Sequence, residues 1–196
     1  MSTSNNRYNN EVQVTWKDEE SKTSSIVKLS EDKLTNMIAS SSNKLCEITS
    51  LALPDRNIQA IVNLRNMPCL RRLDLSNNKI TKLSNFDAVS HISLLNVSNN
   101  QLSSDNALEE LRYLNELRTL NIMGNVKLMH IKSHIVKPIA NLQVLVASDC
   151  GLTKASFLKF LPLLNTLVLS KNKLNCFTSD QVGKLVHLRK LSLGGN

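Results

Sequence analysis

Aromatic residues, glycine and long apolar runs are scarce in this chain of 196 residues. Aromatic side chains make up 4% of the sequence, and glycine occurs only 5 times. No apolar run reaches the roughly 18 residues of a membrane helix, and the polar residues 1–10 lack the apolar core of a signal peptide. Without a glycine-rich loop before a helix, a nucleotide site is not predicted. We therefore expect neither membrane insertion nor secretion, and a core of aliphatic side chains.

The motifs of common catalytic and metal sites are also missing. No serine stands in Gly-x-Ser-x-Gly, and no serine or cysteine is obviously paired with a histidine and an acid. His130 and His134 are four residues apart, but they do not form His-Glu-x-x-His and no third ligand is evident. An exposed helix face explains them better. We predict that the chain is not an enzyme, holds no metal or other cofactor, and has no small-molecule substrate.

The cysteines are few and far apart. They are Cys46, Cys69, Cys150 and Cys176, with no Cys-x-x-Cys pair and no cluster of the kind that forms extracellular disulfide caps. We interpret them as reduced thiols. This predicts a cytoplasmic protein, with a nuclear or a cytoskeletal and ciliary location as alternatives.

The net charge of +8 allows two interpretations. A basic chain can bind RNA, DNA or an anionic membrane. Here, however, the lysines and arginines are dispersed, and the longest basic runs are pairs such as Arg71 and Arg72. A solvated surface therefore explains the charge better, and neither nucleic acid nor membrane is predicted as a partner.

Leucines at regular intervals dominate the rest of the chain. The pattern L-x-x-L-x-L-x-x-N-x-L recurs seven times, at spacings of 22 to 25 residues. We call each repeat a rung and number the rungs one to seven; their first positions are Ile48, Leu70, Ile92, Leu117, Leu142, Leu164 and Leu188. The pattern predicts an α/β fold: a leucine-rich-repeat solenoid, curved like a horseshoe, with a parallel β-sheet on its concave face and short helices or 3₁₀ turns on its convex face.

Each rung alternates outward and inward residues, as a short strand requires. The predicted inward pairs are Leu51/Leu53, Leu73/Leu75, Leu95/Val97, Leu120/Ile122, Leu145/Ala147, Leu167/Leu169 and Leu191/Leu193. After each strand the chain must turn, and a buried amide can satisfy the turn's backbone groups. This role is predicted for Asn78, Asn100, Asn125, Asn172 and Asn196, whereas Cys150 fills the same position in rung five and Arg56 departs from it in rung one.

The return segments between strands are predicted to be helical where they are long enough. In rung three, Leu108, Leu111 and Leu114 predict a helix of two to three turns, beginning after Ser104 and Asp105. In rung four, Ile131, Ile135 and Ile139 are spaced like a helical stripe that ends near Pro138. The shorter rungs have room only for a short or 3₁₀ helix. The phenylalanines, Phe86, Phe157, Phe160 and Phe177, all fall in these segments and are assigned to the convex side of the core.

Three regions follow along the chain. Residues 1–11 are predicted to be a disordered tail, and residues 12–45 a cap with a strand around Val12, Val14 and Trp16 and a helix over residues 30–41. Residues 46–196 are predicted to form the repeat domain. Because the chain stops at the ninth position of rung seven, we expect it to be truncated at its C-terminus.

Two segments carry a family resemblance. Residues 70–83, LRRLDLSNNKITKL, and residues 164–174, LNTLVLSKNKL, resemble the short, intracellular 22-residue class of leucine-rich repeats, and the resemblance covers about residues 46–196. Members of this class include a leucine-rich regulator of protein phosphatase-1, an axonemal dynein light chain and a spliceosomal adaptor between RNA and protein. All of these are binding modules. In rung four the chain departs from the pattern, with Lys127 at a normally apolar position.

The function predicted is a protein–protein interaction scaffold or adaptor whose partner binds the concave face. Alternatives are a phosphatase regulatory subunit, an axonemal or cytoskeletal adaptor, and an RNA-associated adaptor. Apolar residues collect at outward positions of the middle and later rungs, where they suggest an interface; the alternative is that β-branched residues simply suit strands. The predicted partner-binding residues are Arg72, Asp74, Leu94, Asn96, Asn121, Met123, Val144, Val146, Val168 and Lys190.

Overall fold

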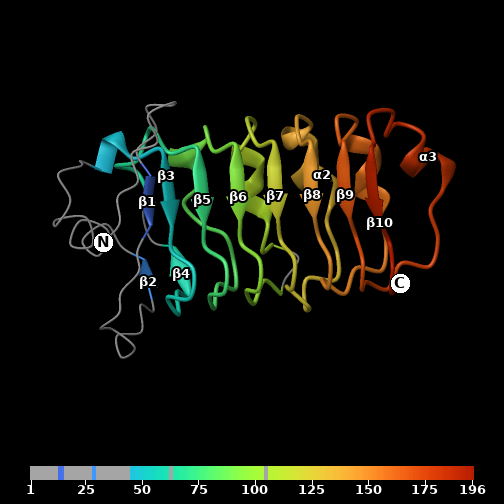
Figure 1. Cartoon of the computed structure of the whole chain (residues 1–196), viewed down its shortest axis with the longest axis horizontal. Helices are drawn as coiled ribbons and strands as arrows, with labels where there is room; N and C mark the ends of the chain where they lie inside the picture. Colours follow the sequence, from blue (N-terminus) through green and yellow to red (C-terminus); the bar gives the residue numbers. More distant parts are fainter. Residues whose placement is uncertain (1–12, 16–27, 30–44, 62–63, 104–105) are drawn as a thin grey trace.

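A computed structural model describes residues 13–15, 28–29, 45–61, 64–103 and 106–196. Eight short strands stand side by side in chain order and form one parallel sheet (Figure 1). Seven of them are the strands predicted from the seven rungs, which confirms the repeat. The strands are β1 (Gln13–Thr15), β3 (Ser50–Ala52), β5 (Arg72–Asp74), β6 (Leu94–Asn96), β7 (Thr119–Asn121), β8 (Val144–Val146), β9 (Thr166–Val168) and β10 (Lys190–Ser192).

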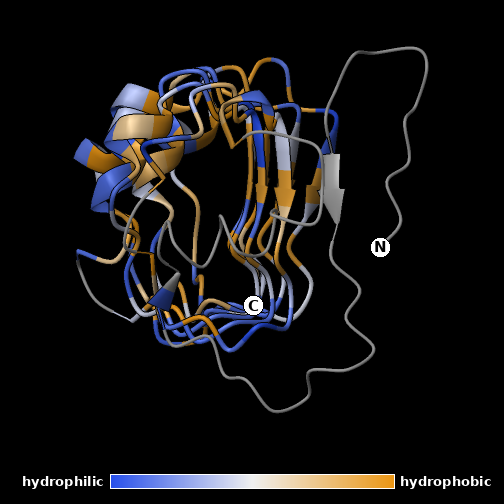
Figure 2. Cartoon of the chain, turned by 90° about the vertical axis from the view of Figure 1, so that its left-hand side faces the viewer, coloured by the Kyte–Doolittle hydropathy of each residue, from blue (hydrophilic) through white to orange (hydrophobic). Residues whose placement is uncertain are grey.

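The register sets the same position of every rung side by side. Leu73 pairs with Leu95, Leu95 with Leu120, and this continues from strand to strand, so the inward leucines form one row. The predicted inward pairs of rungs one to six are all buried. In rung seven Leu191 is 54% exposed, because β10 pairs only with β9. Seen along the row of strands, the sheet lies on one side and the helical returns on the other, with the core between them (Figure 2).

The predicted ladder of asparagines is confirmed. The side-chain amide of Asn100 donates to the carbonyl oxygens of Leu75 and Val97, both at 3.0 Å. Its Oδ1 accepts the N–H of Ile80 in the previous rung, also at 3.0 Å. Asn78, Asn125, Asn172 and Asn196 make equivalent bonds. Each asparagine therefore ties two rungs together through backbone groups that would otherwise lack partners.

In rung five a thiol replaces the amide. The Sγ atom of Cys150 lies 3.1 Å from the carbonyl oxygen of Ile122 and is a weak donor to it. The backbone N–H of Cys150 donates to Oδ1 of Asn172 (3.0 Å). Burial raises the pKa of this thiol to about 12. The side chain is thus a neutral core residue, as the sequence indicates. The other three cysteines are exposed, and all four are free.

The return segments are less helical than predicted. Rung three has a 3₁₀ helix, η3 (Glu109–Tyr113), in place of the predicted helix of two to three turns, and the proposed N-cap residues 104–105 lie outside the described residues. Rung four has one α-helical turn, α2 (Ser133–Val136), followed by η4 (Lys137–Ile139), which contains Pro138. The remaining returns hold η1 (Leu45–Glu47), η2 (Asp87–Val89), η5 (Ser156–Phe160) and α3 (Ser179–Val182).

The spacing of the apolar residues accounts for the difference. Leu108, Leu111 and Leu114 are spaced by three, the period of a 3₁₀ helix, whereas the four-residue spacing of Ile131, Ile135 and Ile139 fits the α-helical turn of rung four. The apolar residues are nevertheless placed as predicted. Leu111, Ile135 and Ile139 are buried, Phe86 and Phe157 are fully buried, and Phe160 and Phe177 pack against the core. Among the described residues no helix is long and apolar enough to cross a membrane.

The N-terminal segment adds strands to the solenoid. The predicted strand is present as β1, which pairs with β3. A second sheet, which the sequence did not predict, joins β2 (Lys28–Leu29) to β4 (Ala60–Ile61). The predicted tail (residues 1–11) and the predicted helix (residues 30–41) lie outside the described residues, so the division into tail, cap and repeat domain stays a prediction.

Candidate protein-binding surface

The outward side chains of the sheet form two rows, which the strand register defines. The first row carries Arg72, Leu94, Thr119, Val144, Thr166 and Lys190. The second row carries Asp74, Asn96, Asn121, Val146, Val168 and Ser192. We call this surface the sheet face. It contains every predicted partner-binding residue except Met123, which follows the end of β7.

The first half of the second row is polar and has a local structural role. Oδ1 of Asp74 accepts the N–H of Ser76 (2.8 Å), and Oδ1 of Asn96 accepts that of Ser98 (3.2 Å). Oδ1 of Asn121 accepts the N–H of Met123 in the same way (3.1 Å). These short polar side chains bond the backbone two residues ahead, as in an Asx turn. They therefore shape the turn after each strand, which the sequence prediction did not foresee.

The second half of the row is apolar. Val146 and Val168 are direct partners in the register of β8 and β9, and Val144 stands on β8 beside them. We call these three residues the valine patch. All three are half-buried, because neighbouring strands lie only about 4.8 Å apart and their side chains shield one another. The structure therefore brings together three of the five predicted apolar residues.

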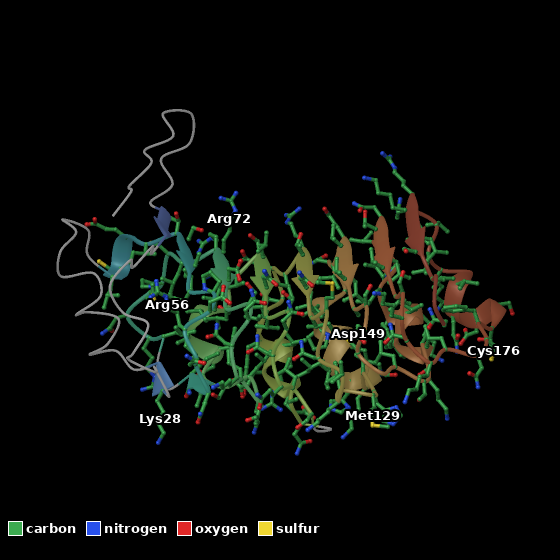
Figure 3. The ribbon with its side chains drawn as sticks, turned by 60° about the horizontal axis from the view of Figure 1, so that its bottom comes forward. Lys28, Arg56, Arg72, Met129, Asp149 and Cys176 are labelled. Carbon is green, nitrogen blue, oxygen red and sulfur yellow. The ribbon has the colours of Figure 1, made fainter. Side chains whose placement is uncertain are left out.

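The other two lie apart from this group. Leu94 is in the first row on β6, and the strand between it and Val144 carries Thr119 in that row. Met123 is 36% exposed and lies past the last residue of β7. The charged residues occupy the ends of the rows. Arg72 extends away from β5 (Figure 3), and Lys190 lies on β10, both exposed.

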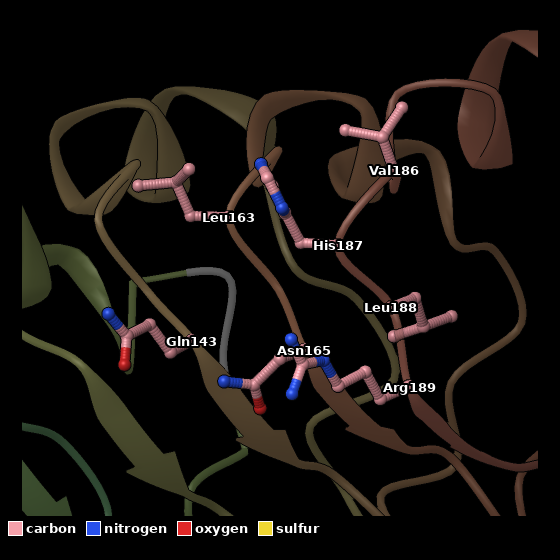
Figure 4. A pocket seen from close by; sticks show the side chains of 7 residues that line it. All are labelled: Gln143, Leu163, Asn165, Val186, His187, Leu188 and Arg189. Carbon is pink, nitrogen blue, oxygen red and sulfur yellow. The ribbon is translucent and has the colours of Figure 1, made fainter.

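A pocket that the sequence analysis missed opens at the N-terminal edge of the last three strands. Its volume is about 470 Å³. Gln143, Asn165 and Arg189 line its polar side, and Leu163 and Val186 line its apolar side (Figure 4). The polar residues all occupy the second position of a rung, directly before β8, β9 and β10. A comparison of the second position from rung to rung would have found these three residues, but the sequence prediction considered only the strand positions.

The two histidines considered for a metal do not converge on one site. His134 lies on α2 with its Nε2 3.0 Å from Oε1 of Glu109. His130 lies before α2, not on it, with its Nδ1 3.5 Å from Oγ1 of Thr153. Across the described part of the chain, no group of three or more histidine, cysteine, aspartate or glutamate side chains is placed to hold a metal ion.

A hydrogen-bonded pair of a histidine and a glutamate lies at the same edge of the sheet as the pocket, nearer to the N-terminus. Nδ1 of His91 lies 2.7 Å from Oε1 of Glu116, and both side chains are about half exposed. This hydrogen bond, together with the nearby charges of Arg71 and Arg118, lowers the pKa of the Glu116 carboxyl. Glu116 is therefore ionised and already engaged by a neighbour.

Solved structures with the same architecture exist. The chain resembles an internalin from Listeria monocytogenes (TM-score 0.60, 22% identity, covering 75% of this chain and 48% of that one). It also resembles TLR13 in a complex with ssRNA13 (TM-score 0.67, 22% identity, covering 85% and 23%) and a leucine-rich-repeat protein of Leptospira interrogans (TM-score 0.63, 24% identity, covering 76% and 37%). The fold is a leucine-rich-repeat solenoid. No protein-family model and no curated protein matches the sequence.

The solenoid spans about half of the internalin, about a third of the Leptospira protein and about a quarter of TLR13. At 22 to 24% identity these similarities establish the fold and nothing finer. A leucine-rich-repeat solenoid presents a long sheet surface made of equivalent positions, and function depends on which side chains occupy them.

Proposed function

We propose that this solenoid is a non-enzymatic scaffold or adaptor that binds another protein on its sheet face. The observation that carries the proposal is the valine patch. In three successive rungs the second row holds an aspartate or asparagine that bonds the turn, whereas the next two rungs hold Val146 and Val168. These valines are partly exposed and forgo the local hydrogen bond.

Strand propensity is the competing explanation, because β-branched residues suit strands in general. Threonine is equally β-branched and occupies the flanking first-row positions, Thr119 and Thr166. Strand propensity alone would therefore allow threonine at positions 146 and 168, and it does not explain why both residues are valine. A cluster of apolar side chains on an outer surface is a common mark of an interface, and charged residues at both ends, Arg72 and Lys190, fit a polar rim.

Finer assignments rest on the family resemblance and on the distribution of charge. The resemblance to the 22-residue repeat class favours a cytoplasmic regulator, such as a phosphatase subunit or an axonemal or cytoskeletal adaptor, without separating them. One specific observation favours an RNA-associated adaptor as a second candidate. From Lys137 to the C-terminus the chain has eight lysines and arginines and only two acidic residues, Asp149 and Asp180.

The test is capture of partners from a lysate of the source cells by the immobilised chain, followed by mass spectrometry. Val146→Glu and Val168→Glu each place a charge in the valine patch. An outward glutamate should reduce folding stability by less than about 1 kcal/mol. A desolvated charge at an interface centre should reduce capture of the main partner at least about tenfold. Val126→Glu is the matched control, because Val126 is 56% exposed and lies off the sheet face.

Capture that depends on Val146 and Val168, with normal thermal unfolding of both variants, supports the proposal. If both variants capture the partner as well as the parent chain does, the proposal is contradicted. The partner would then bind the convex side or the N-terminal segment. A catalytic activity in the purified chain would contradict the non-enzymatic part.

A further inference from the structure

The pocket at the N-terminal edge of β8 to β10 contains polar groups without partners. Among the described residues, the side chains of Gln143, Asn165 and Arg189 make no hydrogen bond and no ion pair. The two amides are nevertheless half-buried. A half-buried amide without a partner loses part of its hydration and gains nothing in return. Such groups are available to a ligand that offers matching donors and acceptors.

The backbone holds these three side chains in a fixed order. The N–H of Asn165 donates to the carbonyl oxygen of Gln143, and the N–H of Arg189 donates to that of Asn165, both at 2.8 Å. The side chains therefore start about one strand spacing apart, and Arg189 reaches across toward Asn165 (Figure 4). Two amides followed by a guanidinium form a polar strip along one side of the pocket.

The other side of the pocket is apolar and exposed. Leu163 is 39% and Val186 is 76% exposed. No phenylalanine, tyrosine or tryptophan lines the pocket, and His187 and Arg189 supply its only planar groups on which a nucleic-acid base could stack besides the two amides. A polar strip opposite two aliphatic side chains fits a polypeptide, which carries both amide groups and aliphatic side chains.

Charge selects an acidic ligand. Of the two acidic residues after Lys137, Asp180 pairs with Lys159 (3.1 Å), and Asp149 follows the opposite, C-terminal end of β8. Neither lines the pocket, whereas Arg189, His187 and the adjacent Lys190 lie in or beside it. A guanidinium binds a carboxylate through two parallel hydrogen bonds.

We propose that this pocket binds a short, extended, acidic segment of the partner protein. A glutamate or aspartate of the segment pairs with Arg189, its main-chain amide groups bond Gln143 and Asn165, and an aliphatic side chain packs on Leu163 and Val186. The inference rests on the proposed function, because Gln143 directly precedes the valine patch at Val144. The pocket and the valine patch are therefore adjacent on β8.

The probe is a short fluorescein-labelled peptide rich in glutamate and leucine, with its Glu→Gln counterpart as the control peptide. Anisotropy should show that the acidic peptide binds and that Arg189→Ala weakens it about five- to tenfold, the range of one charge-assisted contact. Gln143→Ala and Asn165→Ala should each weaken it about two- to fivefold. Arg112→Ala, the same charge change on the convex side, should leave it unchanged. In spectra of ¹⁵N-labelled protein, the acidic peptide should shift the side-chain amides of Gln143 and Asn165.

Three results would overturn the inference. These are equal binding of the Glu→Gln peptide, unchanged binding to the folded Arg189→Ala variant, and displacement of the peptide by oligouridine that binds more tightly. Partner capture separates the two proposals. If Val146→Glu abolishes capture and Arg189→Ala does not, the proposed binding on the sheet face stands and the proposed role of the pocket is rejected. Loss of capture with Arg189→Ala alone supports the pocket and rejects the valine patch.

Discussion

At the scale of single residues, two departures from the repeat pattern, Cys150 and Lys127, occupy the two positions that a ladder hydrogen bond joins in other rungs. In every rung with a ladder asparagine, Oδ1 accepts the N–H of the eleventh residue of the rung before, as Asn172 does from Leu152 (3.0 Å). Cys150 has no comparable acceptor. The eleventh residue of the preceding rung is Lys127, where the chain turns instead and the N–H of Leu128 bonds the carbonyl of Asn125 (2.9 Å). A polar residue is tolerated at position 127 because no ladder side chain accepts its backbone N–H and fixes it in the core.

Cys150 should react differently from the three exposed cysteines. With its pKa raised to about 12 by burial, it has almost no thiolate near pH 8, and the core blocks the reagent. Thiol titration of the folded protein should count three fast groups, and unfolding should release a fourth. Two thiols in the unfolded, unreduced protein would instead indicate a disulfide and contradict the predicted cytoplasmic location.

The same thiol makes stability depend on alkaline pH. An unfolded cysteine ionises near pH 8.5, well below the raised pKa of the folded state. The contribution of Cys150 is therefore complete below about pH 8.5 and is lost as the pH rises toward 12. Urea unfolding across this range should show a smaller alkaline loss in Cys150→Ala than in the parent chain, and equal losses would show that other groups cause it.

Removing one ladder amide should be costly. Asn172→Ala leaves buried backbone groups of rungs five and six without partners, at roughly 2 to 4 kcal/mol of unfolding free energy. Asn175→Ala is the control, because Asn175 is exposed and should lose less than about 0.5 kcal/mol. Chemical denaturation measures both, and similar losses would refute the structural role of the ladder.

At the scale of elements, strands were more predictable than returns. A strand needs only alternation and a regular interval, and leucines such as Leu73 and Leu95 supply both. The returns are short, and a few apolar residues fit an α-helix or a 3₁₀ helix almost equally well. Leu108, Leu111 and Leu114 are spaced by three, which the 3₁₀ helix η3 matches more closely than the predicted α-helix. The pairing of β2 with β4 joins segments about 30 residues apart and has no local signal.

The turn after β7 has glycine at a rung position where Asn77, Asn99, Asp149 and Lys171 also adopt a positive φ. Gly124 has φ of +75°, and a Cβ there would lie 2.1 Å from Oδ1 of Asn99. Gly124→Ala should therefore reduce the unfolding free energy by roughly 1 to 2 kcal/mol, mainly because the side chain of Asn99 must move and alanine is less favourable than glycine at positive φ. Gly194→Ala meets nothing within 4 Å and should be close to neutral. Equal melting temperatures for the two variants would contradict this assignment.

At the scale of the whole molecule, the sequence located the sheet face but not the use of each position. Val144, Val146 and Val168 follow from alternation alone. The turn-forming role of Asp74 depends on the conformation after the strand, and the pocket depends on three rungs lying side by side. Surfaces built across repeats have no contiguous signal in the sequence, so only the stacked structure brings them together.

Stability should fall toward β10. Each rung contacts mainly its neighbours, β10 pairs on one side only, and Leu191 is 54% exposed. Amide hydrogen exchange should therefore be fastest in β10 and slowest in the middle strands β6 to β8. Uniform protection from β5 to β10 would show that the solenoid unfolds as one cooperative unit.

The described residues carry their charge unevenly along the axis of the solenoid. Those before Lys137 include eleven lysines and arginines and seven acidic residues, whereas the last 60 residues carry eight and two. A negatively charged partner would thus be drawn first toward the β8 to β10 end, before any contact forms. Such steering acts on the association rate, which should fall steeply with ionic strength while the dissociation rate changes little. The solenoid would then orient an acidic partner during its approach.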